Sequence, residues 1–120
     1  MGLDSTRKHK RVRVSLPVEI FDILNNKDIV GRIIDISAGG VALITNEQLT
    51  LHSPISLTFE VGGIKYDKLS ADVVREIQKE EQYFLGIAFF NMCLEEQEEL
   101  DGIVRRLYSL KERGMQREKL

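Results

Sequence analysis

The sequence predicts an all-β fold, a six-stranded antiparallel barrel, followed by one C-terminal α-helix. Six short apolar runs alternate with a period of two residues and are separated by turn-forming residues. The apolar spacing becomes helical after residue 91, and hydrophobic residues make up 42% of the 120-residue chain. That share is enough for a single core, and it argues against intrinsic disorder.

The first two strands are predicted on either side of a polar turn at residues 25–28. The first has one apolar face, formed by Val12, Val14, Leu16, Val18 and Ile20. Pro17 interrupts this run, and because proline cannot donate to a strand ladder it indicates a sheet edge or a bulge. The second strand is expected over residues 29–36, which are rich in β-branched side chains.

Four further strands are expected over residues 41–45, 55–61, 64–77 and 83–90. Gly62 and Gly63 stand between two alternating runs, which is typical of a tight hairpin of type I′ or II′. Gly86 interrupts the last strand and indicates a bulge or a close approach of another backbone. Short strands at this spacing favour an antiparallel barrel over a parallel sheet.

The helix is predicted from a single apolar stripe at Leu100, Ile103, Val104, Leu107 and Leu110. Glutamates crowd its start and basic residues its end, which suits the helix dipole. We expect Gly114 to end it and Gly102 to let it lie close to the barrel. The chain therefore divides into a flexible basic arm (1–11), a barrel with its helix (12–114) and a frayed tail (115–120).

Composition excludes several classes of protein. The single cysteine, Cys93, rules out a disulfide framework and a four-cysteine zinc site. No apolar run is long enough to span a membrane, and no apolar segment follows the basic N-terminus, so we expect a cytoplasmic protein. The net charge of −2 combines two basic ends with an acidic body, which argues against coating a nucleic acid but is compatible with one compact anion.

An enzyme is not expected. His9 and His52 have no neighbouring ligands at metal-binding spacing, so no metal site is predicted and both are interpreted as solvated side chains. Cys93 follows an apolar stretch and is more typical of a structural thiol than of a nucleophile. The glutamates of residues 95–99 fit a solvated helix start better than acid–base catalysis.

The arm carries the first candidate site, in the run Arg7-Lys8-His9-Lys10-Arg11. Each arginine has a planar, permanently charged fork that can pair with phosphate or with a guanine edge, or can lie flat on a base. An arm with two such forks could close over a nucleotide. Taken alone, the segment is more typical of a solvated basic tail.

The second candidate site is the segment Asp35-Ile36-Ser37-Ala38-Gly39-Gly40, directly after a strand. Alternation along residues 33–37 places Asp35 and Ser37 on one face, where a carboxylate could accept from guanine N–H groups and a hydroxyl could donate or accept. The two glycines permit positive φ, so that the backbone can turn tightly and come close to a ligand. An ordinary turn between two strands is the alternative interpretation.

Together, RxxxR before the first strand and (D/N)xSxxG after the second resemble the PilZ domain family. The matching residues are Arg7, Arg11, Asp35, Ser37 and Gly40. Residues 16–18, 73–75 and 85–89 and the final helix also fit, so the resemblance covers about residues 5–110.

This resemblance implies a barrel that binds the bacterial second messenger cyclic di-GMP. Arg7 and Arg11 would hold guanine edges and phosphates, Asp35 and Ser37 would contact a guanine, and Gly40 would shape the turn. We expect additional contacts from Lys8, Arg13 and Gly39. Thr6 stands where family members often carry another arginine, which favours one bound messenger over an intercalated pair.

The expected function is that of a receptor or adaptor whose arm becomes ordered on binding and which then signals to an unidentified protein partner, as a monomer or weak dimer. The main alternative is a PilZ-like barrel that does not bind the messenger and acts through protein–protein contacts. A small barrel that binds single-stranded nucleic acid is less well supported, because it needs aromatic residues interleaved with cations, and the chain has three Tyr, five Phe and no Trp.

Overall fold

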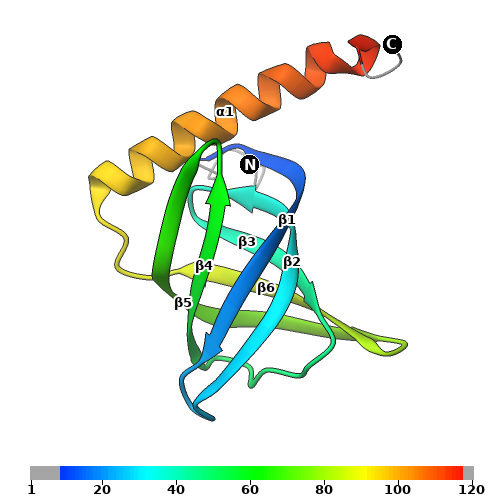
Figure 1. Ribbon diagram of the computed structural model, residues 1–120, viewed down its shortest axis with the longest axis vertical. Coiled ribbons are helices and arrows are strands. Elements are labelled where there is room, and N and C mark those ends of the chain that lie inside the picture. The colour runs from blue at the N-terminus through cyan, green and yellow to red at the C-terminus, as the bar shows by residue number, and fades with distance from the viewer. Residues whose placement is uncertain (1–8, 118–120) are drawn as a thin grey trace, which may run out of the picture.

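The computed structural model describes residues 9–117, which form six strands and one helix (Figure 1). In chain order these are β1 (Arg11–Asp22), β2 (Lys27–Ser37), β3 (Gly40–Thr45), β4 (Pro54–Val61), β5 (Ile64–Lys79), β6 (Gln82–Phe89) and α1 (Leu94–Arg117). The predicted barrel of six strands with a C-terminal helix is therefore confirmed.

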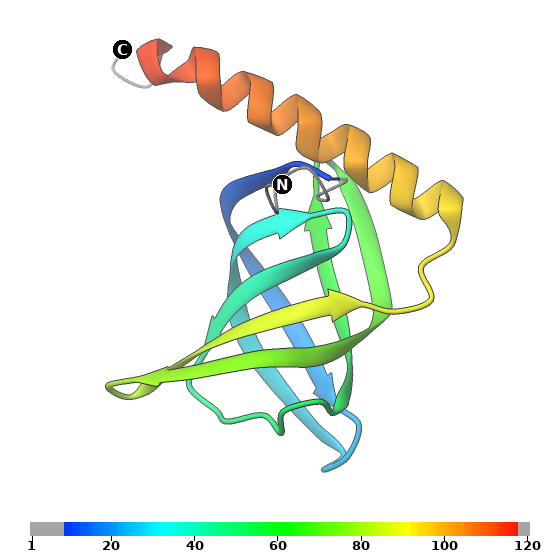
Figure 2. The ribbon, with the colours of Figure 1, turned by 180° about the vertical axis from the view of Figure 1, so that it is seen from behind.

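The strands close into one barrel in the order β1-β2-β3-β6-β5-β4, and every neighbouring pair is antiparallel. Helix α1 lies across one end of this barrel, next to the start of β1 and the β4–β5 turn, as both views show (Figures 1 and 2). No helix within residues 9–117 is both long and apolar enough to cross a membrane.

The core follows the alternation of the strands. Inward side chains such as Ile33, Leu57 and Val73 are completely buried. Helix α1 closes the end of the core with Leu100 and Val104, which are equally inaccessible. Its apolar stripe is only partly covered, because Leu110 remains 43% exposed.

The β4–β5 hairpin and the helix meet at two contacts. Gly62 (φ 61°) and Gly63 (φ 82°) form the predicted tight turn, and positive φ at both positions identifies type I′. A methyl group on Gly62 would lie 2.8 Å from the Ile103 side chain, so this turn packs directly against α1. The buried Tyr66 hydroxyl donates a hydrogen bond of 2.8 Å to Glu99 on the helix.

Two predictions about the helix were wrong. It does not end at Gly114 but continues to Arg117. Glycine lowers helix stability without ending a helix unless the chain turns left-handed there, and the residues that follow favour helix. Nothing lies within 4 Å of a methyl group built on Gly102, so this glycine is not required for close packing on the barrel.

The barrel is incompletely paired at one seam. Strand β1 pairs with β4 only from Glu19 to Asp22, whereas its pairing with β2 begins at Arg11. Among the described strands, residues 12–18 therefore have a neighbour on one side only. Pro17 lies in this part of β1, which agrees with the edge position predicted for it.

Candidate functional site

Four of the predicted site residues meet where the β1–β2 pair reaches the helix end of the barrel. Arg11 lies opposite Ser37 and Arg13 lies opposite Asp35 in the antiparallel register. Arg7 and Lys8 are outside the described residues. The two sequence segments, separated by more than twenty positions, are therefore brought side by side by strand pairing.

A bulge in β2 determines which side of the strand the motif side chains face. The register between β2 and β3 shifts between Ile33 and Asp35, which makes Ile34 an extra residue in that ladder. Ile33 and Ile36 are consequently both fully buried although they are three residues apart. In a strand without this bulge, a continuation of the phase of Ile33 would point Asp35 into the core. Asp35 and Ser37 do share one side of β2, as predicted, but Ile33 lies on the other.

The side chains of Arg11 and Asp35 form an ion pair at the surface. Arg11 Nε lies 3.4 Å from Asp35 Oδ1, and the side chains are 40% and 29% exposed. The geometry is not that of a hydrogen bond, and Asp35 Oδ1 has no hydrogen-bond partner among residues 9–117. This oxygen is itself buried, so it can accept an N–H group from a ligand only after the Arg11 guanidinium moves aside.

Ser37 holds the turn between β2 and β3. Its side chain is buried, its hydroxyl accepts from the Gly39 amide at 3.1 Å, and the same hydroxyl lies 3.4 Å from the Gly40 carbonyl as a donor. This is the geometry of a serine that satisfies the backbone of its own turn. It fixes the loop immediately beside Asp35.

The surroundings of the two glycines of the motif differ. Neither adopts positive φ, so the left-handed conformation that glycine permits is not used at this turn. A methyl group on Gly40 would lie 2.1 Å from the Ile87 carbonyl oxygen of β6, so Gly40 is needed for the close approach of β3 and β6. The same group on Gly39 would meet nothing nearer than 3.8 Å.

Sequence reasoning missed a contact between the end of the arm and the helix. His9, interpreted as solvated, is half-buried, and its Nδ1 lies 3.5 Å from Asp101 Oδ1 on α1. The next residue, Lys10, places its ammonium 4.7 Å from the centre of the Tyr108 ring. Both contacts attach the start of β1 to the helix. The position of His9 between the two motif arginines was the only available signal.

No group of three or more residues that could hold a metal ion occurs in the part of the chain that the structure describes. The chemistry available at this end of the barrel is that of charged hydrogen bonding. Arg11 and Arg13 offer donors, Asp35 offers an acceptor, and the ordered turn at Ser37 and Gly39 presents backbone close by.

Solved structures share this fold. YcgR from Escherichia coli in complex with c-di-GMP has a TM-score of 0.72 at 16% identity, over 94% of this chain and 49% of that one. The MrkH–c-di-GMP complex of K. pneumonia has a TM-score of 0.73 at 20% identity, over 89% of this chain and 53% of that one. The chain therefore spans about half the length of each.

The separate PilZ domain of E. coli YcgR with c-di-GMP matches over nearly its whole length. The alignment covers 95% of this chain and 98% of that one, with a TM-score of 0.69 and 16% identity. No curated protein sequence matches the chain. The family model described as PilZ domain matches residues 5–106, which includes both motifs and all six strands. The chain belongs to the PilZ domain family.

Proposed function

We propose that this protein is a receptor for cyclic di-GMP and not an enzyme. The observation that carries the proposal is the pairing of Arg11 with Asp35 across β1 and β2, in a chain that retains both motifs of its family. Similar folds in YcgR and MrkH have been solved with c-di-GMP bound, which supports the same ligand class here.

In the proposed complex, Asp35 accepts hydrogen bonds from the N–H edge of one guanine. The oxygen that lacks a donor, Oδ1, is buried beside Arg11, so it becomes an acceptor for the ligand only when the guanidinium moves away. Arg11 already lies beside it, so binding needs only a short movement of the guanidinium from the carboxylate to a phosphate or to the O6/N7 edge. Arg13 lies on the same side of β1 as Arg11 and opposite Asp35, and it adds a second cation.

The arm would complete the site. Arg7, with help from Lys8, closes over the ligand from the segment before β1, while Gly39 leaves the turn beneath it open. His9 and Lys10 are attached to α1, so the arm pivots at this point. Ordering of the arm changes the surface next to the helix, and a protein partner that contacts this surface receives the signal.

A calorimetric titration with cyclic di-GMP, with GTP as the control ligand, tests the proposal. We expect saturable binding to the messenger alone, and the stoichiometry distinguishes one bound molecule from an intercalated pair. Charged hydrogen bonds contribute about 1.5–3 kcal/mol each, so Arg11→Ala should weaken binding by roughly 10- to 150-fold. The matched control is Arg106→Ala on the exposed face of α1, which should leave affinity unchanged.

An absence of heat with the wild-type protein would refute the receptor and favour a barrel that acts through protein contacts alone. One observation favours that alternative: the Ser37 hydroxyl is already engaged within its turn. Equal losses of affinity in Arg11→Ala and Arg106→Ala would refute the assignment of the site, though not the binding itself.

A further inference from the structure

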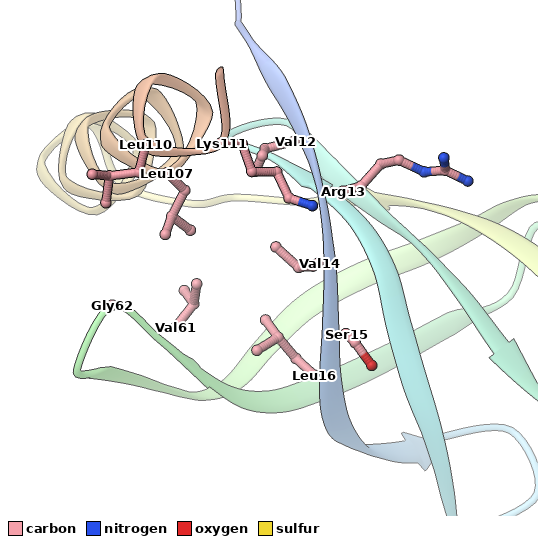
Figure 3. Close-up of a pocket in the computed structure, with 10 residues that line it drawn as sticks. All are labelled: Val12, Arg13, Val14, Ser15, Leu16, Val61, Gly62, Leu107, Leu110 and Lys111. Carbon is pink, nitrogen blue, oxygen red and sulfur yellow. The ribbon is translucent and has the colours of Figure 1, made fainter. Parts of the chain in front are cut away.

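The seam between β1 and β4 opens into a groove on the face away from Asp35. Its volume is about 680 Å³, and it runs beneath the second half of α1. Figure 3 shows apolar side chains from three elements converging on it, whereas Arg13 and Ser15 point away on the other side of β1. The converging residues are Val14, Leu16, Val61, Leu107 and Leu110.

One wall of the groove is an unpaired strand edge. Residues 12–16 of β1 lie beside β2 on one side, where the register shifts between Arg13 and Leu16, and no described strand pairs with them on the groove side. Pro17 ends this stretch because it has no amide hydrogen. Alternate residues of an extended strand direct their backbone groups to opposite edges. The donors and acceptors of residues 12–16 that face the groove can therefore pair with an extended segment from outside, and a lipid chain would leave them unpaired.

The charge around the groove is positive. Lys111 extends from α1 toward β1 at its rim (Figure 3). An adjoining hollow shares Val12, Arg13 and Lys111 with the groove and adds Arg11, with Glu112 as its one carboxylate. An occupant that carries acidic side chains next to apolar ones complements this surface, whereas a second copy would bring the same cations face to face.

We propose that this groove binds an extended acidic segment of a partner protein, which adds to the free edge of β1 as a strand. Alternate apolar side chains of the segment fill the space between β1, the β4–β5 turn and α1. Its acidic side chains meet Lys111 at the rim. This docking site goes beyond messenger binding and does not require it, because its apolar lining and Lys111 take no part in the Arg11–Asp35 contact.

A synthetic peptide provides the probe: seven residues that alternate glutamate or aspartate with valine, with both ends blocked. We expect it to bind the full-length protein without cyclic di-GMP and to protect amides of residues 12–16 from hydrogen exchange. A peptide with lysine at the acidic positions, and one with N-methylated amides on its pairing edge, should each bind at least about tenfold more weakly. Equal binding of all three peptides would overturn the proposal.

Two exposed residues allow matched variants that spare the core. Leu110→Glu and Lys111→Glu should each weaken the acidic peptide by about tenfold or more. The controls are Leu24→Glu in the β1–β2 turn and Lys79→Glu at the end of β5, both exposed and outside the groove lining, and both should bind as the wild type does. A loss of binding that is the same in the control variants would overturn the assignment of the groove.

The test also separates other occupants and the messenger site. Protection of the groove-side amides among residues 12–16 in the free protein, together with dimers in sedimentation that Leu110→Glu abolishes, would show that a second copy occupies the groove instead of the peptide. The same protection in a protein that remains monomeric would show that another segment of this chain occupies the groove. Asp35→Ala should abolish messenger binding and spare peptide binding, so failure of one site is distinguishable from failure of the other.

Discussion

Adjacent glycines in the motif provide a matched pair of substitutions. Gly40→Ala would place a methyl group 2.1 Å from the Ile87 carbonyl oxygen, while Gly39→Ala would meet nothing nearer than 3.8 Å. Both glycines have negative or extended φ, so backbone strain does not distinguish the two variants. The comparison therefore isolates the close approach of β3 to β6.

The expected cost follows from what must move. Overpacking costs about 1–3 kcal/mol, and the upper end applies because a backbone carbonyl cannot move aside by changing rotamer. Replacing glycine by alanine also restricts the unfolded chain, which offsets about 0.4–1 kcal/mol. Gly40→Ala should therefore lose about 2 kcal/mol net, and Gly39→Ala should be unchanged or more stable by up to about 1 kcal/mol.

Thermal unfolding followed by circular dichroism measures this difference. For a domain of this size about 1 kcal/mol corresponds to roughly 4 °C, so Gly40→Ala should melt about 8 °C below the wild type. Gly39→Ala should melt at or slightly above it. If Gly40→Ala melted within about 2 °C of the wild type, the explanation of Gly40 by strand approach would be wrong.

Three further predictions concern α1. Gly102→Ala should raise stability by about 0.5–1 kcal/mol in urea unfolding, because the site is open and helical, and a decrease would contradict that description. Tyr66→Phe should cost about 0.5–1.5 kcal/mol through the lost bond to Glu99. Burial and the Glu99 contact raise the Tyr66 pKa above its ordinary 10.0, so wild-type stability should fall as the pH rises above that value, and the fall should shrink in Tyr66→Phe. Asp101→Asn should increase fast backbone motion at His9 in NMR relaxation, and unchanged motion would show that their contact does not hold the arm.

Alternation was sufficient to predict the strands because one face of each is buried. Val12, Val18 and Ile20 all point into the core as their spacing indicates. The apolar stripe of the helix was an equally reliable signal, since Leu100 and Val104 are fully buried. Local patterns of this kind reflect burial directly, and burial decides which elements form.

The candidate site depended on contacts between distant segments, which periodicity does not encode. The two sequence motifs indicated that Arg11 and Asp35 belong to one site, but they did not predict the ion pair between the side chains. The close approach of Ile87 to Gly40 comes from strand order, so the glycine was explained by φ instead of by packing. The contact between His9 and Asp101 depends on where α1 crosses the barrel, which no local pattern specifies.

The bulge in β2 has a consequence for comparing this chain with its relatives. If Ile34 were deleted, simple alternation would still bury Ile33 and Ile36 and turn Asp35 outward. The bulge therefore accommodates one extra residue in the strand. We therefore expect relatives to gain or lose a residue at this point while the motif continues to face outward. An alignment that forbids a gap inside the strand would then pair core residues with surface residues. The distance along the sequence from the core of β2 to the motif is thus a poor guide to homologous positions, and the inward or outward direction of each side chain is a better one.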